Sequence, residues 1–162
     1  PGAAAAPAVP PAVAAAWATA ALPKAGFWVR AMAAVVDAAL VGLIEGALAA
    51  LLTRVGGIEP DFGSAEGLTM MLVLGLFGTL VGITYRVAFL GHGGQTPGKM
   101  LAQVKVVRTD GSELGYGRAV LREVIGKFLS KLILGVGYLM VAFDRQKQGL
   151  HDKIADTYVI KL

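Results

Sequence analysis

The sequence predicts an α-helical membrane protein with two transmembrane helices, a helical hairpin that re-enters the membrane or lies at its interface, and a small cytoplasmic β-sheet. Of its 162 residues, 56% are hydrophobic and only 16% are charged, whereas a soluble domain has about 25% charged residues. Two apolar segments are long enough to cross a bilayer, and short alternating segments follow them. One domain is the natural count for a chain of this length.

Residues 1–24 are rich in alanine and proline and hold five of the chain's seven prolines. Prolines at positions 7, 10 and 11 disfavour a helix. The segment also lacks the basic start and uninterrupted apolar run of a secretory signal. We therefore expect a flexible, partly polyproline cytoplasmic tail, followed by the membrane domain at residues 25–162.

The two expected spans cover about residues 29–52 and 68–90, each reaching the roughly 20 residues that a bilayer crossing needs. The loop between them has Arg54 as its only basic residue, whereas Lys and Arg residues precede the first span and follow the second. Positively charged loops stay in the cytoplasm. We therefore expect an integral membrane protein, surrounded by the lipid bilayer, with its N-terminus in the cytoplasm.

A third apolar run, at residues 132–143, is only 12 residues long and is too short for a typical span. Basic residues flank it on both sides, and residues 116–131 have apolar positions at helical spacing with basic residues among them, a pattern typical of a helix at the membrane surface. We expect a re-entrant or interfacial hairpin over about residues 118–143, broken near Gly135 and Gly137. A third full span is the alternative.

Two segments have the short alternation of strands. Residues 101–114 alternate valines with polar residues up to Asp110-Gly111, a strong tight-turn signal. Residues 157–162 have the same β-branched character. Since isolated strands are marginal in water, we expect the two to pair into a small cytoplasmic sheet.

The first span carries Arg30, Asp37 and Glu45, although a charge at bilayer depth costs at least about 2.5–3.5 kcal/mol. Arg30 and Asp37 lie seven residues apart and share a helix face, with Glu45 within a quarter turn of it. In the second span a GxxxG pattern at 78–82, which permits close helix contact, precedes Arg86. We expect Asp37 to pair with Arg86 or Arg30, because an unpaired buried carboxylate would protonate instead.

Three of these charges could instead reach a membrane surface. Arg30 and Arg86 could extend to lipid headgroups, as basic side chains at helix ends do. Glu45 could reach the external interface. Asp37 has no such route, so it is the strongest candidate for a functional or pairing role.

Several kinds of site are not expected. The chain has no cysteine, which excludes disulfides and thiolate chemistry. Residues 93–99, GGQTPGK, match a phosphate-binding loop, but Met100 stands where Ser or Thr is needed and the loop follows a membrane helix. His92 and His151 are the only histidines, and no nucleophile motif is present. We expect no enzyme, cofactor, metal site or nucleic-acid partner.

Three segments together resemble the RDD family of membrane proteins, which is named after one arginine and two aspartates. They are AGFWVRAMAAVVDAAL, GHGGQTPGKMLAQVKVV and DRQKQGLHDKIADT, and the resemblance covers Ala25 to the C-terminus. It implies that Arg30 is the family arginine and Asp37 the first aspartate. It matches the second aspartate best to Asp152, with Asp144 as the alternative, and implies a bacterial inner (cytoplasmic) membrane.

Two functions remain open. The resemblance implies ion or small-solute translocation, of the cation/proton antiport type, through a polar network that includes Arg30, Asp37 and Asp152 or Asp144. Arg86 and Glu45 join this network on physical grounds only. The ligand would be a monovalent cation or a proton, and because two spans cannot enclose a polar path, this hypothesis expects a homo-oligomer. The alternative is a non-catalytic accessory or structural subunit of a larger membrane protein complex.

Overall fold

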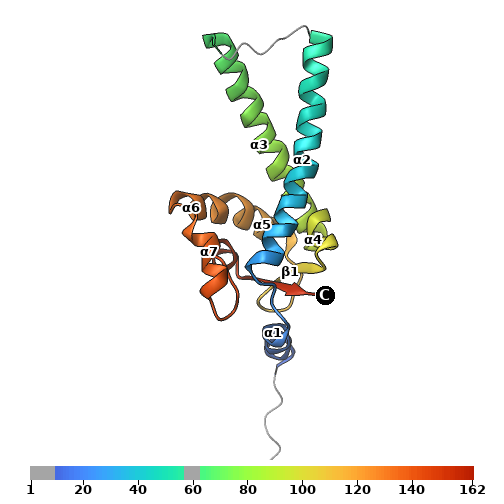
Figure 1. Cartoon of the computed structure of the whole chain (residues 1–162). Coiled ribbons are helices and arrows are strands. Elements are labelled where there is room, and N and C mark those ends of the chain that lie inside the picture. The colour runs from blue at the N-terminus through green and yellow to red at the C-terminus, as the bar shows by residue number, and fades with distance from the viewer. Residues whose placement is uncertain (1–9, 57–62) are drawn as a thin grey trace, which may run out of the picture.

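The computed structural model describes residues 10–56 and 63–162. Figure 1 shows two long helices projecting from a body formed by the other elements. Residues 1–9 of the expected tail and 57–62 of the expected outer loop lie outside the described residues. In chain order the elements are α1 (Pro11–Ala21), α2 (Phe27–Gly56), α3 (Ala65–Gly93), α4 (Pro97–Leu101), β1 (Val104–Arg108), α5 (Gly115–Val120), η1 (Leu121–Gly126), α6 (Lys127–Leu132), α7 (Val136–Phe143), α8 (Leu150–Ile154) and β2 (Thr157–Lys161).

The two expected membrane helices are confirmed as α2 and α3. Each contains 29 residues that are apolar enough to cross a membrane, or roughly 40 Å at 1.5 Å per residue. Apolar side chains such as Leu43 (71% exposed) and Leu72 (64% exposed) point away from the protein, as a lipid-facing surface requires. The helices lie close together near the body and diverge at their far ends (Figure 1).

The expected sheet is also present. β1 and β2 pair antiparallel, with Val106 opposite Val159, and both of these valines are fully buried. β1 is shorter than the expected strand because residues 97–101 form α4 and the turn at Gly111 (φ 85°) ends the pairing. On the other edge of β2, Lys24 forms an antiparallel bridge with Ile160.

The structure differs from the expected tail at residues 11–21, which form α1. Pro10 precedes this helix in an extended conformation (φ −54°, ψ 141°), and Pro11 occupies its first turn. Proline is tolerated there because the first backbone N–H groups have no partner within the helix. Thr19 of α1 is buried and lies against Gly111, so α1 contacts the turn after β1.

The expected break in the hairpin occurs at Leu134 and Gly135, which adopt positive φ values of 54° and 79°. The stretch α5–η1–α6 and helix α7 meet there at 97°. Gly137 lets α7 return close to α6, because a Cβ atom on it would lie 2.7 Å from Ser130 Oγ. The position of this bent pair in the bilayer, re-entrant or interfacial against a third span, stays a prediction.

Candidate functional site

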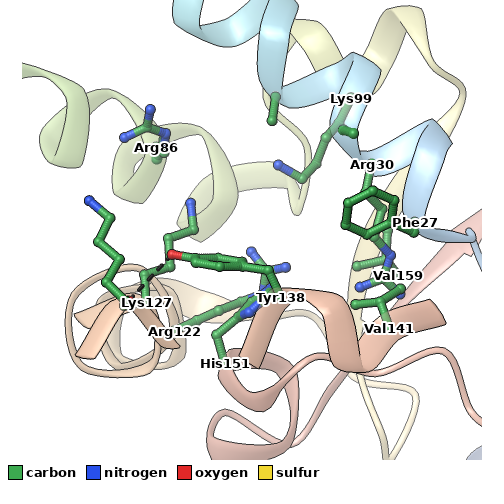
Figure 2. A pocket seen from close by; sticks show the side chains of 13 residues that line it. Phe27, Arg30, Arg86, Lys99, Arg122, Lys127, Tyr138, Val141, His151 and Val159 are labelled. Atoms are coloured by element: carbon green, nitrogen blue, oxygen red, sulfur yellow. Dashed lines mark hydrogen bonds between the residues drawn. The ribbon is translucent and has the colours of Figure 1, made fainter. Parts of the chain in front are cut away.

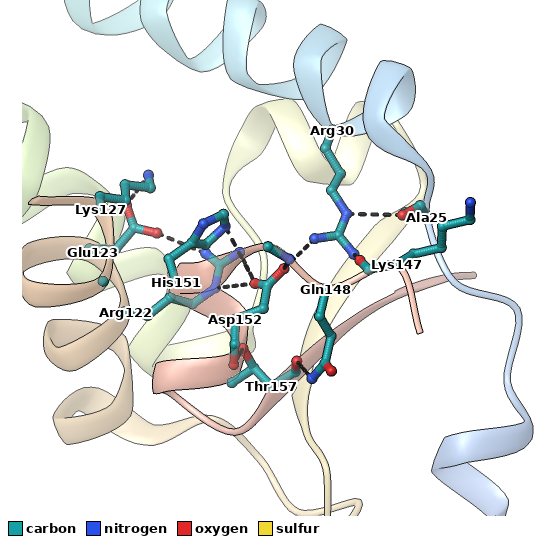
Figure 3. Close-up of polar contacts among 12 residues, drawn as sticks. Ala25, Arg30, Arg122, Glu123, Lys127, Lys147, Gln148, His151, Asp152 and Thr157 are labelled. Carbon is teal, nitrogen blue, oxygen red and sulfur yellow. Dashed lines mark hydrogen bonds and ion pairs between the residues drawn. The ribbon is translucent and has the colours of Figure 1, made fainter. Parts of the chain in front are cut away.

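A fully buried carboxylate, Asp152 of α8, ties α2, η1 and α8 together (Figure 3). Its Oδ2 forms an ion pair with Arg30 and accepts a hydrogen bond from the Gly149 backbone N–H (3.1 Å). Its Oδ1 accepts two more from Arg122, from Nε at 3.0 Å and Nη2 at 2.8 Å. Both carboxylate oxygens are therefore satisfied by segments that lie far apart in the sequence.

The electrostatic setting keeps Asp152 ionised. Burial alone would raise the pKa of Asp152, but the neighbouring positive charges, Arg122 foremost and Arg30 among them, and the hydrogen bond from the Gly149 N–H together hold the pKa of this carboxyl well below its usual range. Burial also lowers the pKa of the neighbouring His151 to about 3, so its imidazole is neutral at physiological pH. A carboxylate and an imidazole that do not titrate near neutral pH indicate a structural cluster rather than a proton-transfer pair.

A π-helical turn, η1, supplies the next part of the cluster. It turns two adjacent charged residues inward, Arg122 (3% exposed) and Glu123 (4% exposed). Glu123 accepts a hydrogen bond from Arg122 Nη1 (2.8 Å) and pairs with Lys127 one turn later. π-turns are rare and often occur at functional sites, and this one joins Glu123 to the arginine that holds Asp152.

A second buried carboxylate, Asp37, lies in α2 and is only 2% exposed. Its Oδ1 accepts hydrogen bonds from the Tyr85 hydroxyl (3.0 Å) and the Gly98 backbone N–H (2.8 Å). Its Oδ2 accepts one from Thr96 Oγ1 (2.5 Å), and Lys99 Nζ lies 4.0 Å from the same oxygen. Three neutral donors and one nearby ammonium therefore surround Asp37.

Contrary to expectation, Asp37 pairs with neither Arg30 nor Arg86. Arg30 and Asp37 share a face of α2 but lie about 10 Å apart along it, so they meet different segments. Helix α4 covers Asp37, and this requires glycine at position 98, where a Cβ atom would lie 2.2 Å from the Ala33 carbonyl oxygen. Arg86 instead donates to the Gly82 carbonyl of its own helix (3.3 Å).

A cavity of about 370 Å³ lies between these two clusters. Figure 2 shows Arg86 and Lys127 on one side of it and Lys99 and Arg30 on another. None of the residues that line it, all of them described, is acidic. The cationic side chains that line it are Arg30, Arg86, Lys99, Arg122, Lys127 and Lys131.

Lys99 is the cationic residue of this cavity that stands beside Asp37. Burial lowers the pKa of Lys99 to about 8, and its side chain is only 14% exposed. The Lys99 ammonium therefore loses its proton more easily than an exposed lysine does.

The remaining expected residues lie outside the two clusters. Asp144 accepts hydrogen bonds from the backbone N–H groups of Gln146 and Gln148 and from Lys153 Nζ (2.6 Å), so it organises the loop after α7. Of the two candidate aspartates, Arg30 contacts Asp152 and not Asp144. Glu45 is half-buried beside Gly78, where a Cβ atom would lie 2.7 Å from its Oε1.

Sequence reasoning missed the roles of Lys99, Thr96 and Glu123. The first two lie in the GGQTPGK segment, which has no charge or apolar spacing that relates it to Asp37 in the first span. Glu123 and Lys127 have the i, i+4 spacing of a helical ion pair, which was an available signal. The inward turn of Glu123 depends on the π-turn, which no sequence pattern indicated.

Residues 24–156 match the RDD family. The chain belongs to this family. It is 33% identical over 141 residues to the uncharacterized membrane protein YteJ of Bacillus subtilis, covering 84% of this chain and 80% of that protein.

Two further relatives extend the comparison. The uncharacterized protein YckC of Bacillus subtilis is 27% identical over 139 residues, which cover 83% of each chain. The proline-rich antigen homolog of Mycobacterium tuberculosis (strain ATCC 25618 / H37Rv) is 34% identical over 70 residues, or 43% of this chain and 29% of that protein. No solved structure matches this RDD family protein. Its two long apolar helices and its relatives make it an integral membrane protein.

Proposed function

We propose that this RDD family protein exchanges a monovalent cation for a proton across the membrane, with Asp37 as the cation ligand and Lys99 as the proton carrier. One observation carries the proposal: a buried carboxylate in a spanning helix has a lysine ammonium 4.0 Å away. Ionisable groups within membrane spans are costly to bury and commonly mark ion and proton pathways.

The exchange follows from competition for Asp37. Protonated Lys99 occupies the place of a cation beside the carboxylate. When Lys99 loses its proton, the place beside the Asp37 carboxylate becomes free for a monovalent cation, with the hydroxyl oxygens of Thr96 and Tyr85 as further ligands once their O–H bonds rotate. When Lys99 regains a proton, its ammonium displaces the cation. One proton moves for each cation, so the charge of the site is conserved.

The proposal includes a homo-oligomer. Two spans are too few to enclose a polar path, and α2 and α3 diverge away from the body (Figure 1). A second copy packed against the groove between these helices, which Glu45, Leu74 and Gly75 help to line, would complete the path. Cross-linking in lipid tests this part, and a strictly monomeric protein would contradict it.

Proteoliposomes that contain a pH dye test the exchange. A pH gradient is imposed and sodium, potassium or lithium is added outside, with wild type compared with Asp37→Asn and Lys99→Arg. We expect cation-dependent collapse of the gradient in the wild type and none in either variant, because Asn carries no charge and Arg does not lose its proton near pH 8. The matched control is Lys161→Arg, at an exposed residue, which should behave as wild type.

The two functions separate in this assay. Unchanged exchange in Asp37→Asn would refute the role of Asp37. A flat trace from folded wild-type protein would refute cation/proton exchange and favour the accessory subunit, which should then co-purify with a larger membrane complex.

A further inference from the structure

We propose that Arg86, Lys127 and Lys131 bind the phosphate of an anionic phospholipid headgroup. These three residues line two neighbouring cavities, the one of about 370 Å³ described above and a cleft of about 470 Å³ between α2, α3 and the hairpin. They therefore lie where the cavities meet, at the level where the spans leave the body.

The charge balance at this junction favours an anion. Within the described part of the chain, Arg86 and Lys131 have no carboxylate oxygen within 4.0 Å. Lys127 pairs with Glu123, which Arg122 also contacts. A surplus of partly enclosed positive charge is unfavourable unless an anion neutralises it.

The carboxylates of the cleft do not supply that anion. Glu123 is already bound by two cations. The Glu45 carboxylate lies against Gly78, whereas the Arg86 guanidinium reaches back to the Gly82 carbonyl, four residues or about 6 Å further along the axis of the same helix, so Glu45 is not an ion-pair partner of Arg86. The positive surplus thus remains at the end of the cleft near the hairpin.

The apolar side of the cleft favours a lipid over a free phosphate ion. Ile83, Val124 and Phe128 line it beside the three cations, and Val124 and Phe128 are 38% and 64% exposed. All three belong to a spanning helix or to the hairpin beside it. Cations next to an open apolar wall match a phosphate that carries an acyl chain, and basic pockets between membrane helices bind anionic headgroups in this way.

The test is binding of fluorescent phosphatidylglycerol to the purified full chain in detergent, with unlabelled phosphatidylglycerol, phosphatidylcholine or inorganic phosphate as competitor. We expect only phosphatidylglycerol to compete well. Lys131→Gln, at an exposed side chain, should weaken binding about fivefold, and the double variant Arg86→Gln/Lys131→Gln by more than tenfold. Lys161→Gln removes the same charge elsewhere and should leave the affinity unchanged.

Each contrary result overturns the proposal. Equal competition by phosphatidylcholine would show binding without headgroup recognition, and equal competition by inorganic phosphate would show a site for free anions. An equal loss in Lys161→Gln would show attraction by net charge only. If the double variant does not fold, Lys131→Gln decides the question alone, and wild-type affinity in that variant refutes the site.

Discussion

Replacing Asp152 by alanine should destabilise the protein more than any other single change in the buried clusters. The substitution leaves Arg122 (4% side-chain exposure) and Arg30 (12%) without the carboxylate that they share. Removing one partner of a buried ion pair costs about 3–5 kcal/mol. The two losses do not add fully, because both pairs use one carboxylate, and Arg122 keeps Glu123 while Arg30 keeps the Ala25 carbonyl.

The matched control is Asp144→Ala. Asp144 pairs with Lys153, whose side chain is 43% exposed, and accepts two backbone N–H hydrogen bonds from its loop. An exposed ion pair contributes about 0–1 kcal/mol and a hydrogen bond about 0.5–1.5 kcal/mol. We therefore expect about 2 kcal/mol for Asp144→Ala and about 3–5 kcal/mol for Asp152→Ala.

Denaturant unfolding of the purified protein in one detergent, followed by tryptophan fluorescence, measures the free energy of unfolding of each variant. Equal destabilisation by the two alanine variants would refute the assignment of Asp152 as the central anchor. A loss below about 1 kcal/mol in Asp152→Ala would do the same, because no buried charge would then have been left unpaired.

Three further predictions concern Gly98, His151 and Asp37. Gly98→Ala should reduce the yield of folded protein, because its Cβ would lie 2.2 Å from the Ala33 carbonyl oxygen; wild-type yield and melting temperature would contradict this. The free energy of unfolding should fall as the pH drops from about 6.5 to about 3, because His151 gains a proton in the unfolded chain but stays neutral in the folded protein, where its pKa is lowered. His151→Gln should flatten this pH dependence, which unfolding at several pH values measures. Asp37→Asn should yield more folded protein than Asp37→Leu, because asparagine still accepts hydrogen bonds from the hydroxyl donors; equal yields would exclude that role.

The membrane helices and the sheet could be predicted because their signals are local. A run of lipid-facing residues such as Leu43 and Leu72 indicates a span without knowledge of any partner, and the alternation around Val104 and Val106 indicates a strand. The prediction did not include the helix at residues 11–21, because prolines usually break helices. Pro10 and Pro11 lie at the start of this helix, the one place where proline fits.

The pairing of the buried charges could not be predicted in the same way. Helical spacing placed Arg30 and Asp37 on one face correctly, but their partners depend on where α8 and α4 dock. The expected partner of Asp37 was Arg30 or Arg86, whereas the structure supplies the hydroxyls of Tyr85 and Thr96, a backbone amide and, at 4.0 Å, the Lys99 ammonium. Neutral donors leave no charge pattern in a sequence, and the approach of Lys99 depends on where α4 docks.

The two proposed sites are linked by charge. A cation that approaches Asp37 through the cavity meets the positive side chains that line it, including Arg86 and Lys131, and their potential opposes its entry. A headgroup phosphate bound to Arg86 and Lys131 would cancel part of that potential. Cation/proton exchange should therefore be faster in vesicles with phosphatidylglycerol than in pure phosphatidylcholine, and Lys131→Gln should reduce this difference because it removes part of the repulsion. Equal exchange rates in both lipids would show that the basic junction and Asp37 act independently.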